Sequence, residues 1–171
     1  MMQEIDLIIK PEFISKYTEG YPLIVKESIV SWDAVKEEGT LLNLLDAKGK
    51  FILKAYHGMQ NKGYGWVLST KITETIDSAY FTKKFKSAIA YRKDYYADAS
   101  TTAFRVFNGE GDGVGGLTID YFDGFYLLTW YSLGIYEFKA EILEALKQST
   151  ERKGIYQKKR FDSKGKYLDE K

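Results

Sequence analysis

Residues 104–123, FRVFNGEGDGVGGLTIDYFD, determine the fold expected for this chain. Alternating β-branched and aromatic residues on both sides of the glycines are typical of strands. The stretch therefore predicts a strand, an acidic glycine-rich turn and a second strand, with glycines supplying the positive φ angles that such a turn needs. Asp123-Gly124 favours a tight turn into a third strand at 125–131. The three strands together predict a β-meander.

Two binding motifs overlap the same stretch, and neither fits it. Gly111, Gly113 and Gly116 match the G-x-G-x-x-G spacing of dinucleotide sites, which bind phosphate at the N-terminus of a helix. A strand is expected to follow these glycines, and the carboxylate of Asp112 would repel a pyrophosphate. A calcium loop also fails, because Ile119 stands where the bidentate glutamate is required. The turn is therefore interpreted as a connection between strands.

Composition limits the classes of function. The chain has 171 residues, of which 44% are hydrophobic and 16% aromatic, so one domain or two small ones can bury a core. The formal net charge of +1 provides no global attraction to nucleic acid, so any such attraction has to be local. The chain has no cysteine, which excludes disulfides, cysteine metal sites and cysteine nucleophiles within it. A single histidine, His57, argues against a zinc site or a Ser-His triad, and we expect no metal.

The N-terminus, MMQEIDLIIKPEF, has only a short apolar run, which Asp6 interrupts. Neither a signal peptide nor a membrane span is predicted, so we expect a cytoplasmic protein without a membrane partner. Residues 1–75 combine one short helix, which begins at Pro11, with short strands and close turn signals, a pattern typical of a small barrel. The strands are expected at 5–9, 23–25, 29–30, 41–45, 51–55 and 64–70.

Two amphipathic helices are predicted in the second half of the chain. Residues 76–96 have apolar side chains at helical spacing, with Asp77 as a plausible N-cap, and residues 135–149 repeat the pattern. A further strand is expected to begin at Ile155. Lysines outside the apolar stripe of the first helix form either an ordinary solvated face or a phosphate-contacting one. They are Lys83, Lys84, Lys86 and Lys93.

The order of these parts resembles the N-terminal portion of the class I S-adenosylmethionine-dependent ribosomal RNA methyltransferases that carry a PUA domain, of the large-subunit cytosine-5 type. Residues 104–121 are similar to the family's (Y/F)-R-(L/V)-x-(N/H)-(G/A)-E-(S/G)-D-G-(L/V)-P-G-(L/I)-x-(I/V)-D. Segments 21–25, 39–56 and 76–81 resemble its Pro-containing strand entry, its hairpin and the start of its linker helix. The chain departs at Gly115, where the family has proline, which is expected to loosen the turn.

The resemblance implies an α+β fold: a small PUA-like β-barrel, then an α+β domain with a helix-packed antiparallel β-meander, with the catalytic Rossmann domain absent. It places a PUA-like RNA-binding domain at 1–74, the central domain at 75–157, and a basic hairpin or tail at 158–171 that leads to the missing catalytic domain. Cytosine-5 methylation needs a thiolate, which a chain without cysteine does not supply.

The function implied is therefore RNA recognition and positioning in an rRNA methyltransferase, not catalytic by itself, and whether this chain is an enzyme stays open. No cofactor is expected in this chain, and S-adenosylmethionine is expected for a full-length parent. Ribosomal RNA is the expected partner, and a homodimer is left open. The alternative is a stand-alone PUA-type RNA-binding module or adaptor.

The resemblance also gives candidate site residues by position. Gly20 would permit close approach of a backbone, and Tyr21 would either stack on a base, at about 1–3 kcal/mol, or be a partly buried strand aromatic. In the acidic turn, the carboxylates either face the substrate cleft or pin the turn through Arg105. The RNA-binding candidates are Lys16, Gly20, Tyr21, Lys26, His57 and Lys62. The structural-turn or interdomain candidates are Arg105, Glu110, Asp112, Gly113, Gly116 and Asp120.

Overall fold

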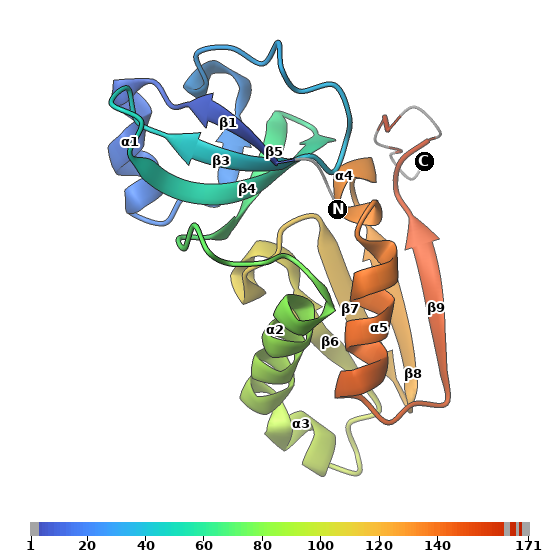
Figure 1. The fold of residues 1–171 in the computed structure, drawn as a ribbon. Helices are drawn as coiled ribbons and strands as arrows, with labels where there is room; N and C mark the ends of the chain where they lie inside the picture. Colours follow the sequence, from blue (N-terminus) through green and yellow to red (C-terminus); the bar gives the residue numbers. More distant parts are fainter. Residues whose placement is uncertain (1–3, 163–164, 167, 169–171) are drawn as a thin grey trace.

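The computed structural model describes residues 4–162, 165–166 and 168, and it contains two β-sheets (Figure 1). The strands of the first sheet run in the order β1-β3-β4-β5-β2, so β1 and β2 are its outer strands. Their bounds are β1 Glu4–Ile8, β2 Leu23–Val25, β3 Leu41–Leu45, β4 Phe51–Gln60 and β5 Gly63–Ser69. The helix α1 (Pro11–Thr18) and the short 3-10 helix η1 (Lys26–Ser28) connect the strands at one side.

The first sheet curls towards a barrel. β1 pairs parallel to β3, and every other pairing is antiparallel. Beyond the ends of the outer strands, Ile9 forms an antiparallel bridge with Ile29, and the backbone nitrogen of Lys10 donates to the carbonyl oxygen of Ser28 at 2.9 Å. The chain segments that follow β1 and β2 are therefore hydrogen-bonded to each other, which protects both edges.

The second sheet has the strand order β6-β7-β8-β9. Helices α2 and α5 lie side by side over one of its faces (Figure 1). The strands are β6 Ala103–Asn108, β7 Leu117–Phe122, β8 Phe125–Trp130 and β9 Gly154–Lys159. The helices are α2 Ser78–Tyr91, α3 Lys93–Ala97, α4 Leu133–Tyr136 and α5 Lys139–Ser149, and the 3-10 helix η2 is Gly109–Asp112. As the sequence predicts, Asp77 caps α2, because its side chain accepts a hydrogen bond from the backbone of Tyr80 at 2.9 Å.

The fold class expected from the sequence needs correction at this sheet. β6, β7 and β8 form the expected antiparallel meander, but β9 pairs parallel to β8 over its whole length. Parallel neighbours need a crossover connection, and α5 supplies it between β8 and β9. Both sheets are therefore mixed, and the second contains a β-α-β unit. Periodicity in the sequence indicates a strand but not its direction, which is why this pairing was missed.

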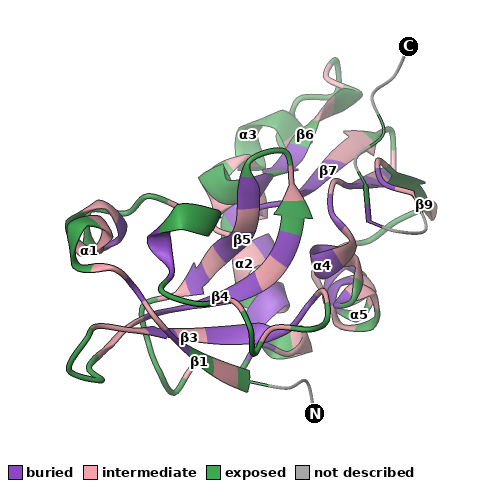
Figure 2. Ribbon diagram, turned by 90° about the horizontal axis from the view of Figure 1, so that it is seen from above, coloured by how far each residue is buried: buried purple, intermediate pink, exposed green. Residues whose placement is uncertain are grey.

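The two sheets share one hydrophobic core. Tyr56 on β4 and Trp66 on β5 belong to the same buried cluster as Phe81 on α2 and Phe107 on β6. Figure 2 shows buried positions along β4 and β5, and α4 contacts β4 directly. A second buried cluster lies inside the first sheet, around Leu42 and neighbouring apolar residues. Burial of each large side chain contributes about 1.5–3 kcal/mol, so the contact between the sheets is a substantial part of the core.

The sequence predicts a basic hairpin or tail at residues 158–171. Lys158 and Lys159 belong to β9. Residues 163–164, 167 and 169–171 lie outside the described residues. Within the part of the chain that is described, none of the helices has the length and apolarity needed to cross a bilayer.

Candidate nucleic-acid interface

A cleft of about 510 Å³ lies between the two sheets. One wall comes from the end of α1 and the loop into β2, with Gly20 and Tyr21. The other wall comes from α2, with Lys83 and Lys84, and from the acidic glycine-rich turn at Gly113. The cleft thus brings together two groups of candidates that lie far apart in the sequence.

Lys16, Gly20 and Tyr21 form a cationic and aromatic lip at the cleft. Tyr21 is 37% exposed, and the Lys16 ammonium lies 3.9 Å from the centre of its ring. This distance is that of a cation–π contact, which holds the positive charge beside the ring. Gly20 has a φ of +98°, and a side chain at its position would meet no atom within 4 Å. The backbone at Gly20 is therefore open to close approach by a ligand.

Lys84 places a partly desolvated positive charge inside the cleft. Burial lowers the pKa of its ammonium, which lies 5.4 Å from the centre of the Tyr80 ring. A β-carbon at Gly113 would lie 2.7 Å from the Lys84 nitrogen, so the glycine provides the room that this ammonium occupies. Desolvated charges attract opposite charges more strongly than hydrated ones do. Lys83, which is exposed on the same helix, adds a second cation to this wall.

The glycine-rich turn is clamped by the first sheet. The Tyr56 hydroxyl donates a hydrogen bond to the carbonyl oxygen of Gly115 at 2.8 Å, and Tyr56 is fully buried. A β-carbon at Gly115 would overlap the ring of Trp66, so a proline would not fit there. Gly113 and Gly116 adopt φ angles of +89° and +82°. The expectation that the missing proline loosens the turn was therefore wrong, because Tyr56 and Trp66 hold the turn from the neighbouring sheet.

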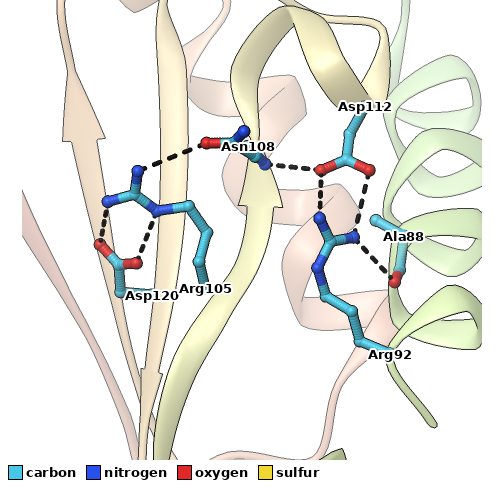
Figure 3. A network of polar contacts seen from close by, with 6 residues as sticks. All are labelled: Ala88, Arg92, Arg105, Asn108, Asp112 and Asp120. Carbon is cyan, nitrogen blue, oxygen red and sulfur yellow. Dashed lines mark hydrogen bonds and ion pairs between the residues drawn. The ribbon is translucent and has the colours of Figure 1, made fainter.

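The carboxylate of Asp112 is occupied within the protein (Figure 3). Arg92 at the end of α2 donates to its two oxygens at 3.1 and 2.9 Å, and the backbone nitrogen of Asn108 donates at 2.6 Å. Arg92 also donates to the carbonyl oxygen of Ala88 at 3.2 Å. The sequence did not predict this partner, because Arg92 and Asp112 lie twenty residues apart and no local pattern links them.

Arg105 and Asp120 face each other across β6 and β7 (Figure 3). The guanidinium donates to the two carboxylate oxygens at 2.8 and 3.2 Å, and it also reaches the side-chain oxygen of Asn108 at 3.4 Å. Such a cross-strand pair fixes the hairpin that carries the turn. Glu110 differs from Asp112 and Asp120, because its side chain has no hydrogen bond or ion pair with any residue that the structure describes.

The remaining RNA-binding candidates lie at the other end of β2. The Lys26 ammonium lies 5.6 Å from the centre of the Tyr64 ring. His57 is largely buried, its Nδ1–H donates to the carbonyl oxygen of Tyr64 at 2.7 Å, and desolvation lowers its pKa. Lys62 lies in the turn between β4 and β5 beside a separate hollow that Trp66 also lines. The structure therefore divides the six candidates between the cleft and the opposite end of the edge strand β2.

The glycine-rich turn does not fit a nucleotide cofactor. Its glycines lead from η2 into β7, and no helix N-terminus follows to receive a phosphate. Beside two of the motif glycines the space is already taken, by the Lys84 ammonium at Gly113 and by the Tyr56 hydroxyl at Gly116. Within the described ranges, no group of three or more acidic, histidine or cysteine side chains is placed to hold a metal ion.

A protein-family model described as "PUA-like domain" matches residues 7–70 of this chain. A Bacillus subtilis protein named "Putative ribosomal RNA large subunit methyltransferase YwbD" is 45% identical over 96% of this chain and 42% of its own length. "Ribosomal RNA large subunit methyltransferase I" of Klebsiella pneumoniae is 26% identical over 74% of this chain and 32% of its own. This chain spans about two fifths or less of these relatives.

Two solved structures are similar along nearly the whole chain. One, described as a "putative sam-dependent methyltransferase" from Streptococcus mutans, has a TM-score of 0.83 and 31% identity, covering 98% of this chain and 44% of its own. The other, a "putative methyltransferase complexed with SAH", has a TM-score of 0.81 and 30% identity, covering 99% and 43%.

These matches also correct a second part of the expected fold class, the absence of a catalytic domain. A missing catalytic Rossmann domain is not supported, because this chain aligns with methyltransferase structures over at least 98% of its length. The position at which a sequence stops carries no information about the domains of the protein. The chain contains a PUA-like domain and is homologous to large-subunit rRNA methyltransferases.

Proposed function

We propose that residues 1–171 recognise and position RNA for a methyltransferase that modifies large-subunit ribosomal RNA with S-adenosylmethionine. The cleft between the sheets is the proposed RNA-binding site. The observation that carries the proposal is the position of Lys84, a half-buried ammonium that lines one cleft together with the exposed backbone of Gly20 and the ring of Tyr21. Phosphate would neutralise this charge, and an unpaired base would stack on the ring.

The identity of the relatives supports the substrate class. Two curated relatives are named as large-subunit rRNA methyltransferases, and a solved neighbour contains SAH. We infer the cytosine-5 type from the motif at 104–121. Cytosine-5 chemistry needs a cysteine thiolate, and residues 1–171 contain no cysteine. Their contribution is therefore binding and positioning, while the cofactor serves the whole protein.

The domain division at 74/75, the cytoplasmic location and a homodimer belong to the same proposal. The stand-alone adaptor makes the same prediction for RNA binding and differs only in the chemistry of the whole protein. Methyl transfer to rRNA by the whole protein, measured with labelled S-adenosylmethionine, separates the two functions.

RNA binding is tested by fluorescence anisotropy with a labelled, structured fragment of large-subunit rRNA at several salt concentrations. The proposal predicts that log K falls linearly with log salt, because phosphate contacts release counterions. Lys83→Gln and Lys84→Gln should each lower the magnitude of the slope by about one. Lys86→Gln is the matched control, since Lys86 is exposed on the same helix but does not line the cleft.

The Lys86→Gln control shows whether RNA binds in the cleft or over the whole basic face of α2. An unchanged slope for Lys86→Gln together with reduced slopes for the cleft variants supports the proposal. Equal effects of all three lysines would contradict it, because the attraction would then be spread over the exposed face of α2. Absence of binding at low salt would contradict it outright.

A further inference from the structure

A second, smaller pocket lies on the other side of the glycine-rich turn. Its volume is about 190 Å³, and it is lined by the end of β4, by β5, by the turn and by the start of β7. Glu110 lines both this pocket and the cleft, so the turn separates two neighbouring hollows. The hollow beside Lys62 also shares Gln60 and Trp66 with the pocket.

Three residues of the pocket wall have buried polar atoms without a hydrogen-bond partner among the described residues. They are the indole nitrogen of Trp66, the hydroxyl of Thr118 and the side-chain oxygen of Gln60. Trp66 is 9% exposed and Thr118 is 8% exposed. A buried polar group without a partner is unfavourable by about 1–3 kcal/mol, so three around one pocket call for a ligand or for ordered water.

We propose that this pocket binds an unpaired nucleobase that carries an exocyclic amino group, a proposal that rests on the proposed function in RNA recognition. Trp66 offers a donor, Gln60 an acceptor, and Thr118 either one. Base edges alternate donors and acceptors in the same way, and bases displaced from a stack are read by such edge contacts in closely fitting pockets. Glu110, whose carboxylate has no partner in the described residues, adds an acceptor that matches an amino group.

The size and charge of the pocket favour a base over a phosphate. An apolar cavity of about 150 Å³ accommodates benzene, so about 190 Å³ accommodates a heteroaromatic ring. A phosphate is disfavoured because Glu110 is acidic and, among the residues that the structure describes, no lysine or arginine lines the pocket. The phosphates of the same RNA would instead meet Lys62 in the adjoining hollow and Lys84 in the cleft. Ordered water alone is the remaining occupant, and the experiment below separates it from a base.

The indole resonances of the three tryptophans provide a direct test by ¹H–¹⁵N NMR. The indole nitrogen of Trp32 donates to the Lys26 carbonyl at 2.9 Å, and that of Trp130 donates to Gln157 at 3.2 Å. Only Trp66 has an indole nitrogen with no partner in the described residues. Titration with cytidine, adenosine or guanosine should therefore shift the Trp66 indole resonance saturably and leave the other two unchanged. Uridine, which lacks an amino group, should bind more weakly.

Thr118→Val gives the matched variant, because it removes the hydroxyl and keeps the side-chain shape. Loss of one hydrogen bond should weaken nucleoside binding about three- to tenfold. Thr129→Val is the control: Thr129 pairs with Thr118 across β7 and β8, is 7% exposed, and does not line the pocket. Its nucleoside affinity should equal that of the unmodified chain.

Each outcome supports or overturns the assignment. No shift of the Trp66 resonance with any nucleoside up to its solubility limit would mean that the pocket holds only water. Equal affinity for uridine, or equal losses in the two variants, would also overturn it. If RNA binds with the expected salt dependence while nucleosides leave Trp66 unchanged, this inference fails and the proposed function stands. If nucleosides shift Trp66 while RNA does not bind, the proposed function fails and the pocket remains a nucleobase site.

Discussion

Removal of the Asp112 carboxylate should destabilise the chain strongly, although Asp112 lies in a surface turn. Asp112→Ala removes the two hydrogen bonds from Arg92 and the one from the Asn108 backbone. Both side chains of the ion pair are only 14% exposed, so water compensates them poorly. Loss of one partner of a buried pair costs about 3–5 kcal/mol, and the remaining exposure lowers the expectation here to about 2–4 kcal/mol.

A double-mutant cycle measures this interaction. Urea unfolding of the unmodified chain, Asp112→Ala, Arg92→Met and the double variant gives the coupling energy, for which we expect about 1.5–3 kcal/mol. Glu110→Gln is the control in the same turn, and its free energy of unfolding should change by less than about 0.5 kcal/mol. A coupling energy below about 0.5 kcal/mol, or a larger loss for Glu110→Gln than for Asp112→Ala, would refute the view that Asp112 pins the turn to α2.

Two further predictions concern the contacts between the sheets, and a third concerns His57 within the first sheet. Tyr56→Phe leaves the Gly115 carbonyl without its donor and should lower the free energy of unfolding by about 1–2 kcal/mol in urea. Gly115→Ala must displace the Trp66 ring and should lower the free energy of unfolding by about 1–3 kcal/mol. Gly111→Ala should lower it less, because its β-carbon would only contact the side-chain nitrogen of Asn108 at 3.6 Å. Burial lowers the pKa of His57 in the folded chain, so as the pH falls the unfolded chain takes up this proton at a higher pH than the folded chain does. The free energy of unfolding should therefore decrease as the pH drops below about 6.5. Urea unfolding at a series of pH values should show a weaker pH dependence for His57→Gln than for the unmodified chain.

Local chemistry in the sequence predicted most elements of this fold. The strands expected at 41–45 and 51–55 correspond to β3 and β4, and in the turn between them Asp46 accepts hydrogen bonds from the backbones of Lys48 and Lys50 at 2.8 and 2.9 Å. The N-cap of α2 at Asp77 was expected for the same kind of reason. These features succeed because the residues that stabilise them are neighbours in the chain.

Long-range contacts account for what the sequence did not predict. The parallel pairing of β9 depends on how α5 packs, and the partner of Asp112 lies on a helix twenty residues earlier. The clamp on the glycine-rich turn comes from Tyr56 and Trp66, which are strand residues of the other sheet. For the same reason, no sequence pattern predicted that Lys84 would share a cleft with Gly20.

Photo-crosslinking tests most directly whether RNA lies in the cleft between the sheets. A 4-thiouridine-substituted fragment of large-subunit rRNA would be irradiated with the chain, and the crosslinked peptides identified by mass spectrometry. The proposed site predicts crosslinks to the peptide that contains Tyr21 and to the one that contains Tyr80, both of which line the cleft. Crosslinks confined to α5 or to the Lys26 end of β2, with none at Tyr21 or Tyr80, would contradict it.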